Sequence, residues 1–96
     1  MSRSVFIGID IATSNVRAVA IDRTGTPLAR ASEPLAQVIK GADKSATQDS
    51  KSWITAVDKV LTHLCKQLVE EGFIPQSLLI SATSGTFVLC DKNNAP

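Results

Sequence analysis

The chain has 96 residues, of which 44% are hydrophobic and 20% are charged, and its formal net charge is +1. This length suffices for one small domain with one core, and the composition is that of a folded globular protein. The balanced charge, without a run of lysine or arginine, excludes a basic nucleic-acid-binding surface. No stretch reaches the roughly 18 apolar residues that a membrane span needs, and the N-terminus lacks a signal-peptide core. We therefore expect a cytoplasmic protein that contacts neither nucleic acid nor membrane.

The first third of the chain predicts three short strands. Apolar side chains alternate through residues 5–11, which places Asp10 at the C-terminal end of the first strand. Residues 16–22 predict a second strand after a small polar turn at residues 12–15. A second turn leads to a weaker third strand at residues 27–33. Strands joined by such short turns form an antiparallel meander.

The middle of the chain predicts an exposed, mobile loop at residues 35–48 and then a helix. The side chain of Asp49 or Ser50 can cap the helix start, and Gly72, followed by Pro75, ends it. Large apolar residues recur at spacings of three and four, as on the buried face of an amphipathic helix. These residues are Trp53, Val57, Val60, Leu61, Leu64 and Leu68.

The last third predicts two more strands. Residues 77–82 form an apolar run after the helix, which favours a buried strand in parallel pairing. Residues 83–86 predict a polar loop, residues 87–90 a fifth strand, and residues 91–94 a turn. The predicted order is β-β-β-α-β-β. This α/β topology is that of the ribonuclease H-like half-domain of the actin-like ATPase superfamily, although topology alone says little about function.

The segment from Asp10 to Arg17 carries the residues best suited to phosphate chemistry. A carboxylate ends one strand, the hydroxyls of Thr13 and Ser14 follow in the turn, and a guanidinium begins the returning strand. Mg²⁺ prefers carboxylate oxygens and water, whereas phosphate oxygens prefer hydroxyl, N–H and arginine donors. The same residue types also make ordinary turns. Asp10 favours the functional interpretation, because burying a carboxylate at the inner end of an apolar strand is costly unless it is paired or near a metal.

Four segments, in the correct order, resemble the FGGY family of carbohydrate kinases. Residues 6–22 resemble the family's opening Gly-Ile-Asp-x-Gly-Thr-Ser/Thr, then Arg or Lys, then a strand that ends in Asp. The segment around Gly25, the run from Gln48-Asp49 to Trp53, and the strand-loop-strand that ends at Asp91 also fit. Only residues 35–47 remain unmatched. The resemblance implies a sugar kinase that uses ATP and Mg²⁺, with residues 1–96 forming an incomplete N-terminal domain.

The resemblance also implies roles for individual residues. Asp10 would help to hold Mg²⁺ through water, and Arg17 would approach the transferred phosphoryl group as the catalytic residue. The ATP phosphates would bind at Thr13, Ser14 and Asn15, and the sugar at the loop of Thr83, Ser84, Gly85 and Thr86. This loop is closer to the Asp-Gly-Thr-Ser-x-Thr form of ribulose and xylulose kinase relatives than to the Gly-Gln-x-His-Gly form of bacterial xylulokinases, which favours a ketopentose substrate.

Three residues depart from the family pattern. Ala12 stands where the family usually has glycine, Ala82 stands where the related subgroup has glycine, and Ser81 replaces an acidic residue. If the turn needs a positive φ at residue 12, alanine would cost roughly 1 kcal/mol there. Two alternatives to a kinase therefore stay open: a kinase-like protein that binds sugar or nucleotide without turnover, and a purely structural module.

The family's catalytic base, its adenine site and a Trp-x-Asp-x-Arg sugar segment are all absent from residues 1–96. We therefore expect a fragment that is inactive alone and that pairs with a second copy through an open strand edge or an apolar patch.

Other notable residues have simpler interpretations. Cys65 and Cys90 are expected to be buried, reduced thiols rather than a disulfide or a zinc site. Trp53 is expected to anchor the core rather than stack on a sugar. The remaining expectations are an exposed helix position for His63 and turn hydrogen bonding for Asp22 and Asp91.

Overall fold

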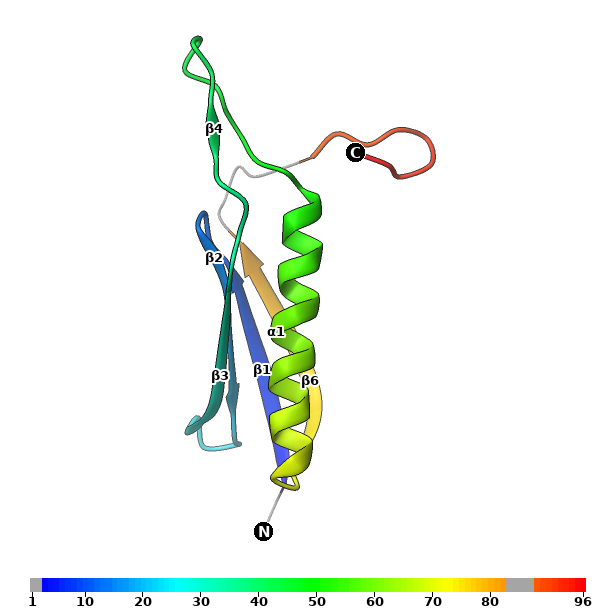
Figure 1. Ribbon diagram of the computed structural model, residues 1–96. Coiled ribbons are helices and arrows are strands. Elements are labelled where there is room, and N and C mark those ends of the chain that lie inside the picture. Colours follow the sequence, from blue (N-terminus) through cyan, green and yellow to red (C-terminus); the bar gives the residue numbers. More distant parts are fainter. Residues whose placement is uncertain (1–2, 83–87) are drawn as a thin grey trace.

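The computed structural model describes residues 3–82 and 88–96, in which one long helix lies along one face of a four-stranded sheet (Figure 1). The sheet has the order β3-β2-β1-β6, and β4 and β5 form a separate two-stranded hairpin. The strands and the helix are β1 (Ser4–Ile11), β2 (Asn15–Ile21), β3 (Pro27–Pro34), β4 (Ile39–Lys40), β5 (Ala46–Thr47), α1 (Lys51–Glu70) and β6 (Ile74–Ala82). The protein is therefore of the α/β class with a mixed sheet.

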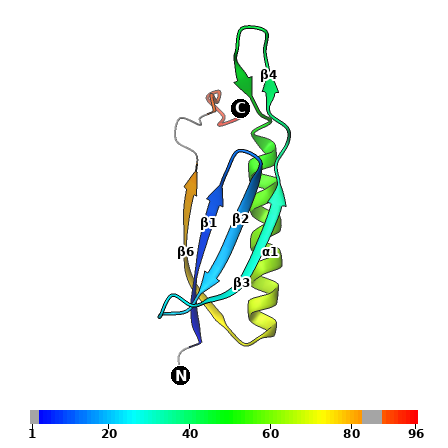
Figure 2. The ribbon, with the colours of Figure 1, turned by 90° about the vertical axis from the view of Figure 1, so that its left-hand side faces the viewer.

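The predicted meander and the parallel strand are both confirmed. β1 pairs antiparallel with β2, β2 pairs antiparallel with β3, and β6 pairs parallel with β1. Because β6 runs parallel to β1, the C-terminal ends of both strands lie at the same end of the sheet. The turn between β1 and β2 also lies at this end (Figure 2). The sheet therefore brings segments about 70 residues apart in sequence to one end.

The core lies between the helix and one face of β1 and β2. Alternate residues of these strands are buried, as the period of two predicts, and they meet the apolar stripe of α1. Burial of each valine, leucine or isoleucine side chain contributes about 1.5–3 kcal/mol. The buried residues are Val5, Ile7, Ile9, Val16, Ala18, Ala20, Ala29, Ala56, Val60, Leu64 and Leu68. Figures 1 and 2 show no described segment over the opposite face of the sheet.

Both ends of α1 follow from local hydrogen bonding. The Asp49 carboxylate accepts a hydrogen bond from the Lys51 N–H at 3.0 Å, whereas Ser50 makes no side-chain cap, so Asp49 is the capping side chain. At the other end, Gly72 has φ +81°, and the Phe73 N–H donates to the Leu68 carbonyl at 2.9 Å. Glycine takes this left-handed conformation at little cost, as the sequence predicts for the end of the helix.

Three predictions about secondary structure and burial were wrong. Residues 35–48 are mostly exposed but contain the β4–β5 hairpin rather than a plain loop. Residues 88–90 form no strand, and Leu89 and Cys90 are exposed, because this apolar run has no neighbouring strand to pair with in the described part of the chain. Cys65 is half-buried against the core, and both cysteines are free thiols, as expected.

Strand β6 is also less buried than predicted. It is one of the two edge strands of the sheet, and α1 packs mainly on β2 and on β3, the other edge strand. Apolar side chains on both of its faces are therefore exposed, including Leu79 at 78% and Ile80 at 48%. No helix in the described ranges is long and apolar enough to span a membrane.

Candidate functional site

The turn between β1 and β2 closes without backbone strain at its alanine. The Ala12 N–H donates to the Asn15 carbonyl at 2.9 Å. Ala12 does not have a positive φ; among the described residues other than glycine, only Lys44 and Asn94 do. The position therefore does not need glycine, and the expected cost of alanine at residue 12 does not arise.

The turn has N–H and hydroxyl donors at Thr13 and Ser14 that are available to a ligand. The Thr13 carbonyl accepts from Gln48 Nε2 at 3.0 Å, and the Ser14 carbonyl accepts from the Leu35 N–H at 2.9 Å. Both Thr13 and Ser14 are exposed, and within the described ranges neither their N–H groups nor their hydroxyls donate to another group. Two N–H groups and two hydroxyls in sequence suit the oxygens of a phosphate group.

Asp10 and Arg17 flank this turn on the sheet face that the helix leaves uncovered. They are direct Cα partners across β1 and β2, and each alternates with buried neighbours that point toward the helix. Asp10 is exposed, so the argument from the cost of burying its carboxylate was wrong. Its side chain makes no hydrogen bond or ion pair with the residues that the structure describes.

Asn15 orients the guanidinium of Arg17. Its Oδ1 accepts a hydrogen bond from Arg17 Nε at 3.1 Å. The terminal nitrogens of Arg17 remain available, because neither donates to a described residue. An arginine held through Nε can still present its other donors to a phosphoryl group.

A row of polar residues crosses the sheet at this level. Ser32 of β3 is the partner of Arg17, Arg17 is the partner of Asp10, and Asp10 is the partner of Ser81 in β6. Partners on neighbouring strands project from the same face of a sheet. Ser81 was not among the predicted site residues; its place beside Asp10 follows from the parallel register, which the sequence does not reveal.

The donor set suits a metal that is shared with a bound phosphate. No cluster of three or more His, Cys, Asp or Glu side chains that could hold a metal ion occurs in residues 3–82 or 88–96. Mg²⁺ often binds through one or two carboxylates together with substrate phosphates and several waters. Asp10 beside the exposed N–H and hydroxyl donors of the turn fits that mode and does not form an all-protein cage.

The predicted sugar-binding residues Thr83, Ser84 and Gly85, together with Thr86, lie outside the described residues. Ala82 precedes them at the end of β6 and is the register partner of Ile11. It does not have a positive φ, so alanine in place of glycine is unstrained there as well.

Trp53 does not anchor the core as predicted. It is half-buried, lies outside the core cluster, and donates its indole N–H to Gln48 Oε1 at 2.8 Å. Gln48 therefore links the helix start to the turn, a role that the Gln48-Asp49…Trp53 motif does not by itself reveal. Asp22 and Asp91, by contrast, accept turn hydrogen bonds as predicted.

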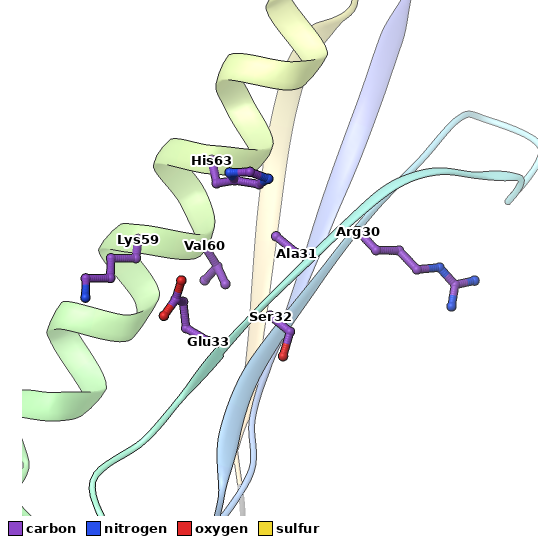
Figure 3. Close-up of a pocket in the computed structure, with 7 residues that line it drawn as sticks. All are labelled: Arg30, Ala31, Ser32, Glu33, Lys59, Val60 and His63. Atoms are coloured by element: carbon purple, nitrogen blue, oxygen red, sulfur yellow. The ribbon is translucent and has the colours of Figure 1, made fainter.

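A separate groove lies between β3 and α1 (Figure 3). Figure 3 shows Arg30 pointing away from Glu33 and Lys59, so these charges do not converge on one ligand. His63 is exposed on the helix, as expected, and forms no hydrogen bond with a described residue. None of the predicted site residues lines this groove.

Residues 5–96 match the FGGY family of carbohydrate kinases, N-terminal domain. The chain belongs to this family. The match covers the turn, the sheet and the helix, so the resemblance inferred from four segments extends over almost the whole chain.

Several individual proteins to which the chain is similar are xylulose kinases. Two xylulose kinases from strains of Staphylococcus epidermidis are 27% and 26% identical over 96 residues, which is all of this chain and 19% of each relative. The crystal structure of xylulose kinase from Rhodospirillum rubrum is 26% identical with a TM-score of 0.84, covering 93% of this chain and 18% of that one. A xylulose kinase structure from Brucella ovis, at 24% identity, has a TM-score of 0.83 and covers 94% and 19% of the two chains. The chain thus spans about one-fifth of the length of these relatives.

Proposed function

We propose that this chain supplies the phosphate- and magnesium-binding part of a kinase that transfers the γ-phosphoryl group of ATP to a hydroxyl of a ketopentose. The observation that carries this proposal is the arrangement at the end of the first hairpin. Asp10 and Arg17 are register partners on β1 and β2, and the turn between the two strands has exposed N–H and hydroxyl donors. Membership in a family of carbohydrate kinases supports the same reaction.

Each residue of the hairpin has a role in the proposal. Asp10 would hold Mg²⁺ through water, and Thr13, Ser14 and Asn15 would bind the ATP phosphates. Arg17 would stabilise the charge that develops on the transferred phosphoryl group. Phosphoryl transfer depends mainly on positioning and on electrostatic stabilisation, so fixed donors and a permanently charged arginine are the groups it needs.

The rest of the active site would come from other parts of a longer protein. The chain spans 19% of the xylulose kinases to which it is similar, and the family's catalytic base and adenine site have no counterpart in these 96 residues. We therefore propose that residues 1–96 form the ribonuclease H-like part of an N-terminal domain and do not catalyse phosphoryl transfer alone.

The ketopentose assignment is supported by the names of the two Staphylococcus epidermidis relatives and of the Rhodospirillum rubrum structure, which are xylulose kinases. In the proposal, Thr83, Ser84 and Gly85 face the sugar from the end of β6. A kinase-like protein that binds without turnover is the alternative. The sequence features that suggest this alternative are Ala12 and Ala82, which replace glycines of the family pattern. Neither residue is in a conformation that requires glycine, so the structure gives this alternative no support from them.

The test is a coupled ADP-release assay on the whole protein with Mg·ATP. The panel contains D-xylulose, D-ribulose and L-ribulose, with fructose, gluconate, glycerol and xylitol for comparison. The proposal expects turnover with at least one ketopentose and less with the other compounds. Turnover only with a non-pentose would contradict the substrate class, and sugar binding without turnover would favour the alternative.

A further inference from the structure

Gln48 makes three hydrogen bonds that join distant parts of the chain. Its Nε2 donates to the Thr13 carbonyl at 3.0 Å and to the Ala36 carbonyl at 2.6 Å, and its Oε1 accepts from Trp53 Nε1 at 2.8 Å. Only one orientation of the amide satisfies all three partners, because carbonyls only accept and an indole N–H only donates. The side chain is half-buried, and its amide group serves contacts within the protein.

The bond to Thr13 sets the direction of a donor in the turn. In a planar trans peptide, the carbonyl of one residue and the N–H of the next point in opposite directions. When Gln48 draws the Thr13 carbonyl toward itself, the Ser14 N–H is directed away from Gln48. That N–H has no partner among the described residues, and Ser14 is exposed.

The other two bonds connect this peptide to the more rigid part of the fold. Trp53 lies in the first turn of α1, a helix that packs mainly on β2 and β3. Ala36 follows Leu35, whose N–H holds the neighbouring Ser14 carbonyl at 2.9 Å. The Thr13 carbonyl is thus held by Gln48, and the Ser14 carbonyl is held by the segment that Gln48 also binds through Ala36.

We propose that Gln48 is a positioning residue, which fixes the turn at Thr13 and Ser14 so that its N–H groups are already directed toward an ATP phosphate before the nucleotide binds. This inference rests on the proposed function for the identity of the ligand. The restraint on the turn follows from the hydrogen bonds themselves. Donors that are fixed in advance lose less freedom on binding and so bind more tightly.

Four variants of the whole protein separate this role from a general structural one. Gln48→Ala removes all three bonds, and Gln48→Glu keeps an acceptor for Trp53 but cannot donate to either carbonyl. Trp53→Phe removes only the indole donor and keeps most of the ring. Gln37→Ala is the matched control, because Gln37 is an exposed glutamine of the same segment with no hydrogen bond to a described residue.

The first measurement is amide hydrogen exchange, which does not depend on any enzymatic activity. Gln48→Ala is expected to speed exchange at least several-fold at the hydrogen-bonded N–H groups of Ala12 and Leu35, and to leave residues 18–21, at the end of β2 far from the turn, unchanged. Unchanged exchange at Ala12 and Leu35 would overturn the inference. A rise that extends equally to β2 would also overturn it, because it would mean general destabilisation.

The second measurement is calorimetric titration with Mg·ATP and, separately, with the sugar. Gln48→Ala should weaken Mg·ATP binding by roughly tenfold, the scale of one or two lost hydrogen bonds, and leave sugar binding unchanged. Gln48→Glu should weaken it at least as much, Trp53→Phe by less, and Gln37→Ala not at all. Equal loss of sugar and nucleotide binding would contradict a positioning role. If Gln48→Ala fails to fold, Trp53→Phe carries both measurements.

The two proposals fail in distinguishable ways. A wild-type protein that binds Mg·ATP but phosphorylates no sugar overturns the proposed kinase function, while the exchange and nucleotide titrations still decide the role of Gln48. A wild-type kinase whose Gln48→Ala variant keeps normal exchange and normal Mg·ATP affinity overturns only the role of Gln48.

Discussion

Asp10 and Arg17 are direct Cα partners across the first hairpin, on the sheet face that the helix does not cover. Within the described part of the chain they form no ion pair with each other, and Arg17 is held instead by the side chain of Asn15. The carboxylate and the guanidinium are therefore both available to a ligand. A bound Mg²⁺ and phosphate between them would complement both charges.

Replacement of Arg17 should reduce turnover more than it reduces substrate affinity. In the whole protein, Arg17→Lys keeps the charge but loses the planar fork and the bond to Asn15, and we expect kcat to fall by roughly 10²–10³-fold, the scale for one lost electrostatic contact to a transition state. Arg30→Ala is the control, because Arg30 is an exposed arginine on β3. Steady-state kinetics would check this; equal activity of Arg17→Lys and Arg30→Ala would contradict the role.

Loss of the Asn15 side chain should have a smaller effect in the same direction. Asn15→Ala frees the Nε of Arg17 without removing the guanidinium. We expect kcat to fall by roughly three- to tenfold, as for one hydrogen bond of about 1 kcal/mol. At saturating Mg·ATP, kcat of the double variant with Arg17→Lys should be no lower than that of Arg17→Lys alone, because both changes remove the same bond, whereas the proposed contact of Asn15 with the ATP phosphates would affect KM for ATP. Additive losses in this cycle would show that Asn15 acts independently of Arg17.

Replacing Ala12 by the glycine that the family usually has should raise neither stability nor activity. Ala12 has an ordinary backbone conformation, so Ala12→Gly mainly increases the freedom of the unfolded chain. We expect the free energy of unfolding to fall by about 0.4–1 kcal/mol, with activity unchanged. Urea unfolding and kinetics of the whole protein would test this. A gain in stability or activity would mean that the turn needs a conformation that alanine resists.

The helix stripe should dominate the stability of this part of the fold. Leu64 is fully buried in the core, and we expect Leu64→Ala to lower the free energy of unfolding by about 2–5 kcal/mol. Ile54 is 75% exposed on the same helix, so Ile54→Ala should change it by no more than about 0.5 kcal/mol. Chemical denaturation measures both, and a similar cost for the two variants would contradict the observed packing.

Acid should weaken the turn between β2 and β3. The hydroxyl of Thr24 and the N–H groups of Thr24 and Thr26 donate to the Asp22 carboxylate, and these bonds, chiefly that from the Thr24 hydroxyl, lower the pKa of Asp22 below its ordinary value of 3.8. The unfolded chain therefore binds the proton at higher pH than the folded chain. The stabilisation is present above pH 3.8 and is lost as the pH falls through the lower folded pKa.

Melting temperatures at a series of pH values would test this expectation. Asp22→Asn keeps the shape of the side chain but does not titrate. The stability difference between the wild type and this variant should be constant near neutral pH and should shrink as the pH falls below 3.8. Asp58→Asn, at an exposed helix position, is the control. A difference that stays constant down to strongly acid pH would contradict the role of Asp22.

Much of the fold could be predicted because its signals are local. Alternation at Val5, Ile7 and Ile9 identifies one strand face, and the spacing of Val60, Leu64 and Leu68 identifies the buried stripe of the helix. The end of the helix at Gly72 follows from the conformational freedom of glycine. These signals need only neighbouring residues, so the sequence contains them in full.

The remaining features depend on contacts between distant segments. The apolar run at residues 87–90 has the composition of a strand, but pairing needs a neighbour that composition does not specify. The burial of the apolar side chains of β6 likewise depends on which segments pack against this edge strand, and the sequence of the strand does not specify them. Gln48 and Thr13 are 35 residues apart, and their hydrogen bond arises only when the helix start meets the first turn. The sequence therefore predicts a core position for Trp53, whose polar partner Gln48 becomes apparent only in the structure.

The candidate site also has features that local sequence predicts and features that depend on contacts between distant segments. The hairpin from Asp10 to Arg17 is contiguous, so its chemistry was recognisable, and the family resemblance added the expected roles. The alignment of Ser32, Arg17, Asp10 and Ser81 across four strands required the register of the sheet. The exposure of Asp10 also depends on the sheet, because no described segment covers the face on which it lies.

Asp10→Asn tests most directly whether Asp10 holds the magnesium ion of a sugar kinase. The measurement is the rate of ketopentose phosphorylation by the whole protein over a series of Mg²⁺ concentrations, with Asp58→Asn as the control. We predict a loss of at least roughly 100-fold in kcat for Asp10→Asn, with the melting temperature unchanged and the control near wild type. Near-normal turnover and Mg²⁺ dependence in Asp10→Asn would contradict the claim.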